Sequence, residues 1–283
     1  MSKPRFTLPL GERTLIMGVV NVTPDSFSDG GKFRAANAAV AHARALAAQG
    51  ADIVDIGGES TRPGSSGVEL QEELDRVVPV FDALKDAPPA ALSVDTTKME
   101  VARACLARGA RMVNDVSAGR LDGELIRAAA QADAYVVLMH MQGAPRTMQA
   151  APHYENVVAE VAAFLGERAD AALAAGVAGD RIIVDPGIGF GKSLDHNLAL
   201  LAAVPTLKRL GFPLLVGASR KSLFKALLGI DEPAARDAAT AQVTAALAAA
   251  GVDIVRVHEV PGNLQAARLG SALRHGRAPT TKG

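Results

Sequence analysis

Residues 36–64 read ANAAVAHARALAAQGADIVDIGGESTRPG, and they hold one complete unit of regular structure. Ala36–Gln49 carries apolar side chains at helical spacing, and Gly50 is a residue that commonly ends a helix. The short apolar run Asp52–Ile56 then predicts a strand that is buried on both faces. Gly57 begins a polar stretch, which predicts a loop after the carboxyl end of that strand.

The same order of helix, glycine, strand and polar residues recurs along the chain. Helices followed by a glycine are expected at Met99–Arg108 before Gly109, at Phe164–Ala175 before Gly176, and at Ala238–Ala250 before Gly251. Eight apolar runs are expected to form strands, at Thr14–Val20, Asp52–Ile56, Ala91–Val94, Arg111–Asn114, Tyr135–Met139, Arg181–Val184, Pro213–Val216 and Asp253–Val257. Helical segments between doubly buried strands predict an α/β fold with a parallel sheet.

Eight such units in 283 residues favour a TIM (β/α)8 barrel as a single domain. A doubly wound open sheet is the alternative, since it uses the same units. We expect the barrel to span residues 14–275, after an N-terminal extension at residues 1–13 and before a loose tail at residues 276–283. No long linker rich in serine, glycine or proline divides the chain.

Charge and composition argue against several classes of function. Thirty Lys and Arg residues balance thirty Asp and Glu residues, so nothing indicates a nucleic acid or a membrane surface as the main partner. No stretch approaches the roughly 20 uninterrupted apolar residues of a membrane span, and Met1–Leu10 lacks the apolar run of a signal peptide. The lone cysteine, Cys105, can form no internal disulfide and fits a reducing compartment. We therefore expect a cytoplasmic protein, in which Cys105 is a small hydrophobe rather than a catalytic thiol.

In a TIM barrel the active site lies at the carboxyl ends of the strands. Nearly every expected strand here ends in a side chain that is charged or forms hydrogen bonds. The set comprises Asn21, Glu59–Arg62, Asp95, Asn114 with Asp115, His140, Asp185, Ser219–Ser222, and Arg256 with His258. A face with a structural role alone would not need this concentration of polar groups, so it indicates an enzyme.

Arg256 and His258 stand two apart, so on a strand their side chains point to the same side. A cation and an imidazole in one barrel mouth suit an anion such as a phosphate. A simpler interpretation, which can hold as well, is a salt bridge from Arg256 to a neighbour such as Asp55. Asp185 precedes a Pro-Gly pair, so its carboxylate either accepts two parallel N–H bonds from an amidine-like ring edge or only shapes the turn.

Two glycine-rich segments need separate interpretation. Residues 187–193, GIGFGKS, end like a phosphate loop, but Pro186 replaces its first glycine. Lys192 stands where a dinucleotide fingerprint needs its last glycine, so both motifs are excluded. Residues 217–222, GASRKS, follow a strand and open a helix, which predicts an anion site at the helix start, aided by Lys221 and Ser222.

The loop at residues 21–31, NVTPDSFSDGG, is rich in turn-forming residues and has one aromatic side chain, Phe27, near its centre. Phe27 either staples the loop to the barrel or serves in a lid that closes over a substrate ring. No His or Cys spacing typical of zinc is present. The oxygens of Asn21 and Asp29 would instead suit Mg²⁺ held mainly by substrate phosphates.

Eight motifs in this order resemble the dihydropteroate synthase family. They are MGVVNVTPDSFSDGG at 17–31, DIVDIGGESTRPG at 52–64, SVDTTK at 93–98, NDVSAG at 114–119, MHMQG at 139–143, DPGIGFGK at 185–192, GASRKS at 217–222 and RVHEV at 256–260. The resemblance implies a TIM barrel and a transferase of folate biosynthesis, in a family targeted by sulfonamides. Such an enzyme joins 6-hydroxymethyl-7,8-dihydropterin pyrophosphate to p-aminobenzoate and releases pyrophosphate with the help of Mg²⁺.

The resemblance also implies roles for individual residues. The catalytic residues would be Lys221, Arg256, His258, Asp95 and Asp185. The pterin ring would be bound by Asp95, Asn114, Met139, Asp185, Gly217, Lys221 and Arg256, and its pyrophosphate by Asn21, Thr61, Arg256 and His258. The p-aminobenzoate would be framed by Phe27, Arg62, Pro63, Phe190, Lys221 and Ser222, and Mg²⁺ would lie near Asn21 and Asp29. The family is typically homodimeric, and the last helix, Asn263–His275, would contribute to that surface.

Three alternatives remain open. A corrinoid-linked pterin methyltransferase shares the fold, but it would not be expected to combine the 21–31 loop with the SRKS helix start. A non-catalytic paralogue that binds pterin or pyrophosphate would show degraded loops or the loss of Asn21, Lys221 or His258, which are all present. A phosphosugar isomerase would need paired base and acid residues, which are not evident.

Overall fold

The structure is a computed structural model of the chain. It describes residues 5–22, 29–60, 65, 67–143 and 146–276, and the side chains of residues 29–33 lie outside that description. The outcomes below refer to those residues.

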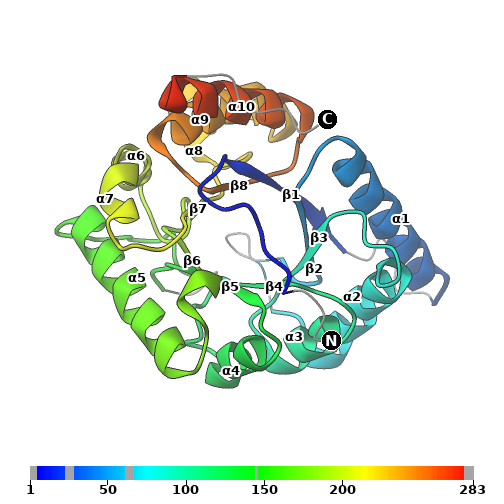
Figure 1. Ribbon diagram of the computed structural model, residues 1–283. Helices are drawn as coiled ribbons and strands as arrows, with labels where there is room; N and C mark the ends of the chain where they lie inside the picture. Colours follow the sequence, from blue (N-terminus) through cyan, green and yellow to red (C-terminus); the bar gives the residue numbers. More distant parts are fainter. Residues whose placement is uncertain (1–4, 23–28, 61–64, 66, 144–145, 277–283) are drawn as a thin grey trace.

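All eight predicted strands are present and form one parallel sheet. They are β1 (Leu15–Asn21), β2 (Ile53–Gly57), β3 (Ala91–Asp95), β4 (Met112–Asp115), β5 (Tyr135–Met139), β6 (Ile182–Asp185), β7 (Leu215–Val216) and β8 (Ile254–Val257). Their order is β6-β5-β4-β3-β2-β1-β8-β7, and an isolated parallel bridge between Val184 and Leu214 joins the two ends. The sheet is therefore closed, which confirms the TIM barrel and excludes the open doubly wound sheet (Figure 1).

Helices surround the ring of strands (Figure 1). They are α1 (Asp29–Ala48), α2 (Leu70–Leu84), α3 (Met99–Leu106), α4 (Gly123–Gln131), α5 (Val157–Ala174), α6 (Leu194–Ala202), α7 (Val204–Lys208), α8 (Leu223–Leu228), α9 (Asp237–Ala250) and α10 (Pro261–His275). The four glycines expected to end helices, at 50, 109, 176 and 251, all have φ between 94° and 106°. That backbone conformation is open to glycine and costly for other residues, so the predicted helix ends are confirmed.

Helix α1 begins at Asp29, several residues before the expected start at Ala36. Gly30 and Gly31 lie in its first turn. Each glycine costs a helix only about 1 kcal/mol, and the first-turn N–H groups need no partner within the helix. Residues 29–31 of the expected 21–31 loop therefore belong to helix α1.

The amino-terminal end of the barrel is closed by apolar side chains. A core cluster within the strands includes Leu15, Met17 and Tyr135, and the preceding segment adds Phe6, Leu8 and Leu10 to it. Arg5 fastens this segment through ion pairs to Asp133 at 2.7 Å and Asp180 at 2.8 Å. In Figure 1 the dark blue start of the chain crosses the ring of strands. Part of the expected N-terminal extension thus forms the floor of the barrel, and the opposite end is left for the site.

The outer core lies between the strands and the helices. It includes Cys105, which is fully buried on α3. Burial raises the pKa of this thiol to about 12, so the nucleophilic thiolate is not available near neutral pH. The expectation that Cys105 is a small hydrophobe agrees with this position. Among the helices that the structure describes, none combines the length and apolar character that a bilayer crossing requires.

Candidate active site

Arg256 on β8 reaches across the barrel mouth to carboxylates on β2 and β3. Its Nε lies 2.7 Å from Oδ2 of Asp55, and one terminal nitrogen lies 2.8 Å from Oδ2 of Asp95. The side-chain amide of Asn114 on β4 donates to the same Asp55 oxygen at 2.9 Å. The sequence predicted both outcomes for Arg256, a place in the mouth and a salt bridge to Asp55, and the structure has both.

Burial shifts the pKa values of the charged groups in this network. Burial raises the pKa of Asp95 to about 7, although the guanidinium of Arg256 opposes the shift. Burial also disfavours the charge on Arg256, but the carboxylates of Asp55 and Asp95 outweigh it and raise the pKa of that group. Oδ1 of Asp55 is buried and has no hydrogen-bond partner within the described part of the chain. The site therefore has unused acceptor capacity, which suits a ligand edge rich in N–H groups.

Asp55 was foreseen only as a salt-bridge partner, and it belongs to the site itself. It is fully buried at the centre of β2, in a run of apolar residues. A carboxylate in the middle of a strand that is buried on both faces is rare unless it is paired. A lone Asp within the apolar run of β2 was therefore the sequence feature that could have identified Asp55 as a site residue.

Asp185 ends β6 with its carboxylate almost fully buried. Its Oδ1 accepts a hydrogen bond of 2.7 Å from the main-chain N–H of Gly187, so it does shape the turn. Burial raises the pKa of Asp185 to about 6, against the opposing effects of that N–H and of Lys221. The register places Asp185 beside Met139 on β5. The carboxylate is thus a turn former that also lies among the mouth residues.

The segment after Asp185 is built around glycine. Gly187 has φ 67°, and a Cβ there would lie 1.9 Å from the carbonyl oxygen of His140. Gly191 has φ 65°, and its Cβ would lie 2.4 Å from the carbonyl oxygen of Gln142. These glycines let the β6 loop pack directly against the β5 loop. The motif excluded as a phosphate loop therefore serves close packing of two loops.

An apolar cluster adjoins the charged residues. It consists of Val116, Met139, Met141, Met148 and Phe190. The ammonium group of Lys221 lies 4.0 Å from the centroid of the Phe190 ring, at the distance of a cation–π contact. Met139, Phe190 and Lys221, which were predicted to bind substrate rings, are therefore brought together.

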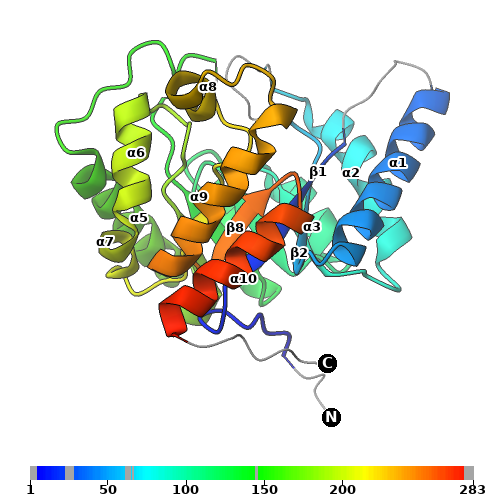
Figure 2. The same cartoon turned by 90° about the horizontal axis from the view of Figure 1, so that it is seen from above.

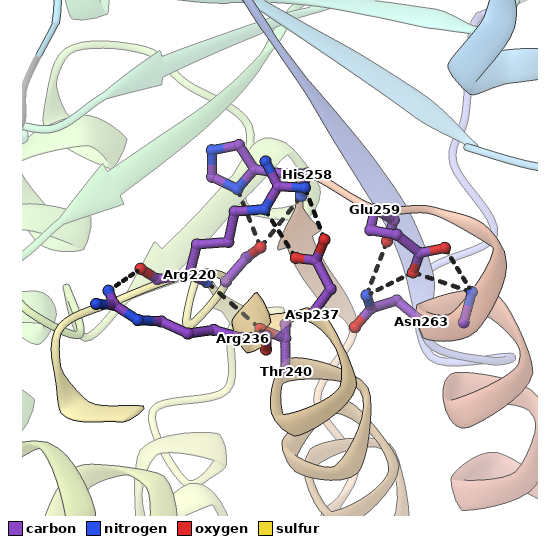
Figure 3. Close-up of polar contacts among 9 residues, drawn as sticks. Arg220, Arg236, Asp237, Thr240, His258, Glu259 and Asn263 are labelled. Atoms are coloured by element: carbon purple, nitrogen blue, oxygen red, sulfur yellow. Dashed lines mark hydrogen bonds and ion pairs between the residues drawn. The ribbon is translucent and has the colours of Figure 1, made fainter. Parts of the chain in front are cut away.

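The β7 loop, residues 217–222, carries Lys221 on one side and contacts His258 on the other. The hydroxyl of Ser219 lies 3.0 Å from Nδ1 of His258 and accepts a 3.2 Å hydrogen bond from the His258 main-chain N–H. Figure 3 shows His258, with Glu259 and Asn263 beside it. Asn263 donates to the carbonyl oxygen of Glu259 at 2.7 Å, so α10 holds the chain next to His258.

Helix α8 after this loop spans only six residues, Leu223–Leu228. Ser222 precedes it in a right-handed helical conformation and caps it with no side-chain hydrogen bond. A helix this short contributes little dipole, since the macrodipole builds up over aligned peptide units. The anion site expected at this helix start would depend on the side chains of Lys221 and Ser222 instead.

Lys192 and His140 form a buried pair that sequence reasoning did not identify. Nζ of Lys192 lies 2.9 Å from Nδ1 of His140 and donates to the carbonyl oxygen of Phe190 at 3.0 Å. Burial lowers the pKa of Lys192 to about 7 and that of His140 to about 3. His140 was expected among the polar strand ends, and it lies there as a neutral partner of Lys192. Lys192 had been considered only as part of a failed phosphate loop.

The remaining predicted residues lie at or after the carboxyl ends of β1 and β2 in the sequence. Asn21 is the exposed last residue of β1. Phe27, Thr61, Arg62 and Pro63 lie outside the described residues, as does the side chain of Asp29. The β2 loop is described as far as Ser60, and there Lys98 binds Glu59 at 2.5 Å and the buried Glu73 at 2.6 Å. Glu59 is therefore tied to the barrel wall.

A closed (β/α)8 barrel with buried carboxylates, cations and an aromatic ring at its carboxyl end matches known proteins. The family model described as pterin binding enzyme matches residues 17–258, so this is a pterin-binding enzyme. A curated relative, the dihydropteroate synthase of Synechocystis sp., is 45% identical over 263 residues, which are 93% of this chain and 91% of the relative. The chain belongs to the dihydropteroate synthase family.

Solved structures of dihydropteroate synthases are similar to this chain in both sequence and fold. The dihydropteroate synthase of Xanthomonas albilineans with 4-aminobenzoic acid is 48% identical, with a TM-score of 0.85 over 93% of this chain and 94% of that one. The same organism's enzyme in complex with 7,8-dihydropteroate has 45% identity and a TM-score of 0.82, over 93% of this chain and 95% of that one. The activity is that of a transferase that condenses 6-hydroxymethyl-7,8-dihydropterin pyrophosphate with p-aminobenzoate, to give 7,8-dihydropteroate and pyrophosphate.

Proposed function

We propose that the reaction is a dissociative displacement in which pyrophosphate departs before the new C–N bond is complete. The C–O bond to pyrophosphate breaks with its electron pair, and the pterin methylene carries the positive charge. The lone pair of the p-aminobenzoate nitrogen then forms the C–N bond, and that nitrogen loses a proton to solvent. Three buried carboxylates at the mouth, Asp55, Asp95 and Asp185, support this proposal because they favour a cationic pterin.

The pterin edge would meet Asp185 and Lys221. An ionised Asp185 can accept two parallel N–H bonds, from the 2-amino group and N3–H, while Lys221 donates to the ring carbonyl and a ring nitrogen. Asp95, Asn114, Met139 and Gly217 would complete the pocket, and Arg256 would lie over the ring face. The support is the short network that already holds Asp95, Asn114 and Arg256 together.

The p-aminobenzoate would lie against Phe190, Lys221 and Ser222. The cation–π contact at 4.0 Å places an aromatic face next to an ammonium group, which suits a flat ring with a carboxylate. Phe27, Arg62 and Pro63, which lie outside the described residues, would frame the other side. Closure of their two loops would exclude water, which otherwise captures the cation.

Asn21, Thr61, Arg256 and His258 would hold the departing pyrophosphate, with Mg²⁺ near Asn21 and Asp29. The described residues contain no group of three or more His, Cys, Asp or Glu side chains that could hold a metal by themselves. The exposed Asn21 at the end of β1 fits a Mg²⁺ ion that takes most of its ligands from phosphate and water. When bound, the ion would neutralise charge on the leaving group.

Pyrophosphate release with purified protein tests the reaction, each of dihydropterin pyrophosphate, p-aminobenzoate and Mg²⁺ being omitted in turn. We expect release only with all three, with dihydropteroate formed in equal amount. Pterin binding without turnover would instead identify a non-catalytic paralogue. Lys221→Ala should lower kcat/KM by a factor that corresponds to several kcal/mol, about 3 or more. A rate near that of the wild type would refute the role of Lys221.

We also propose that the protein is a homodimer and that it is located in the cytoplasm. Figure 2 shows α9 and α10 side by side on the outside of β8. Leu269 and Leu273 on α10 are 59% and 69% exposed, which gives this helix an apolar outer face. Light scattering should give the mass of a dimer for the wild type and of a monomer for Leu273→Glu. A cytoplasmic location is consistent with the unpaired, buried Cys105.

A further inference from the structure

Arg220 lies between two residues of the site, in a conformation that its side chain disfavours. Its φ is 58°, in the left-handed region that residues with a Cβ seldom adopt. Ser219 before it contacts His258, and Lys221 after it contacts the Phe190 ring. Any relaxation of Arg220 would therefore turn one or both of these neighbours away from their partners.

Three residues hold Arg220: Arg236, which directly precedes α9, and Asp237 and Thr240 in its first turns. A terminal nitrogen of Arg236 donates to the Arg220 carbonyl oxygen at 2.9 Å, and the Arg220 N–H donates to the Thr240 hydroxyl at 3.4 Å. The guanidinium of Arg220 binds both carboxylate oxygens of Asp237, each at 2.7 Å. Figure 3 shows these contacts around Arg220, with His258 close by. The main-chain N–H, the carbonyl oxygen and the side chain of Arg220 are thus all fixed by residues 236–240.

Arg236 is itself locked in place. Its side chain is mostly buried, and it also donates to the carbonyl oxygens of Ile230 at 2.9 Å, Asp231 at 2.5 Å and Lys221 at 3.3 Å. Its own carbonyl oxygen accepts from the Thr240 hydroxyl at 2.9 Å. A planar guanidinium can serve several carbonyls in fixed directions, whereas a lysine ammonium on a flexible stem cannot reproduce that pattern. The start of α9 is therefore a rigid support for the β7 loop.

We propose that Arg236 and Asp237 are positioning residues: they keep Arg220 left-handed and thereby aim Lys221 at the ring pocket and Ser219 at His258. This rests on the roles proposed above for Lys221 and His258. Loss of these contacts would slow catalysis, because a displacement of about 1 Å in a positioned group can lower a rate on the order of 100-fold.

The experiment uses Arg236→Lys, which keeps the charge, and Asp237→Asn, which keeps the shape. Arg181→Lys is the matched control, since Arg181 is also a buried arginine and pairs with Asp133 at the opposite end of the barrel. In each test variant kcat/KM for dihydropterin pyrophosphate should fall about 10- to 100-fold. The control should lower Tm and leave kcat/KM within about twofold of the wild type. Values within twofold for Asp237→Asn would overturn the proposal, and this isosteric variant decides the matter if Arg236→Lys does not fold.

A double-mutant cycle separates this inference from the proposed function. If Asp237 acts through the β7 loop, adding Asp237→Asn to Lys221→Ala should lower kcat/KM much less than it does in the wild type. Fully additive losses would show that Asp237 does not act through Lys221 and would overturn the inference. A wild-type rate for Lys221→Ala alone would instead contradict the proposed function, whatever Asp237 does.

Discussion

The ammonium group of Lys192 lies 2.9 Å from Nδ1 of His140, and both side chains are almost fully buried between the β5 and β6 loops. The pair joins the loop that carries Phe190 to the strand that carries Met139. The amine of Lys192 is held by an imidazole and two carbonyl oxygens, close to the carboxylate of Asp185.

Lys192 should make stability depend on pH. Burial lowers its pKa from the ordinary 10.5 to about 7, so between these values the unfolded chain binds more protons than the folded one. Stability rises with pH wherever the unfolded state binds more protons. In urea titrations from pH 7 to 10, the wild type should therefore gain stability relative to Lys192→Met. A difference between the two proteins that stays constant across this range would contradict a perturbed Lys192.

Asp185 should make pterin binding weaken in acid. Its pKa is raised to about 6, and the protonated carboxyl cannot accept two N–H bonds. Below pH 6 the Kd for the pterin should rise about tenfold per pH unit, as measured by calorimetry. Asp185→Asn should bind weakly at every pH and lack this limb. Asp95, whose pKa is about 7, adds a separate limb at higher pH, so the variant comparison identifies the contribution of Asp185.

Removing Arg256 should destabilise the fold as well as abolish activity. Arg256→Met leaves the fully buried Asp55 without its cation, which should lower the free energy of unfolding by about 3–5 kcal/mol. Adding Asp55→Asn to this variant removes the buried charge and should restore part of that stability, with activity still absent. Chemical denaturation measures the free energy of unfolding of the single and the double variant. Equal instability of the single and double variants would argue against an uncompensated charge as the cause.

Gly187 should tolerate no side chain. Gly187→Ala combines a left-handed φ with a Cβ 1.9 Å from the His140 carbonyl oxygen, and it should destabilise the protein by about 3 kcal/mol or more. Gly109→Ala is the matched control, because Gly109 has φ 94° and no neighbour within 4 Å of the added atom. That variant should lose only about 1 kcal/mol, from backbone strain alone. Similar thermal denaturation of the two variants would refute the steric argument.

The fold and much of the site could be predicted because the relevant patterns are local. Apolar runs of strand length, helices that end at glycine, and the polar residues after each strand are all written in adjacent residues. Closure of a parallel barrel then forces those polar ends to one face. Asp95, Asn114, Asp185 and Arg256 accordingly lie where the sequence placed them.

What could not be predicted depends on contacts between distant segments. The left-handed Arg220 is imposed by Asp237 and Arg236, and nothing in the SRKS sequence marks it. Lys192 and His140 are 52 residues apart, and their pairing follows from how two loops pack. The floor formed by Phe6, Leu8 and Leu10 likewise requires knowledge of which end of the barrel the chain first crosses.

The ring of strands is weakly paired between β6 and β7. In the described residues β6 and β7 meet through the Val184–Leu214 bridge, whereas β1 and β2 have five residue pairs in register. Asp185 ends β6 and Lys221 follows β7, so a pterin held by both would link these two weakly paired strands. Any ligand that binds the folded state alone adds its binding free energy to stability. Local opening of the barrel without substrate should therefore occur mainly between β6 and β7. A bound substrate would add a ninth link to the eight contacts between neighbouring strands.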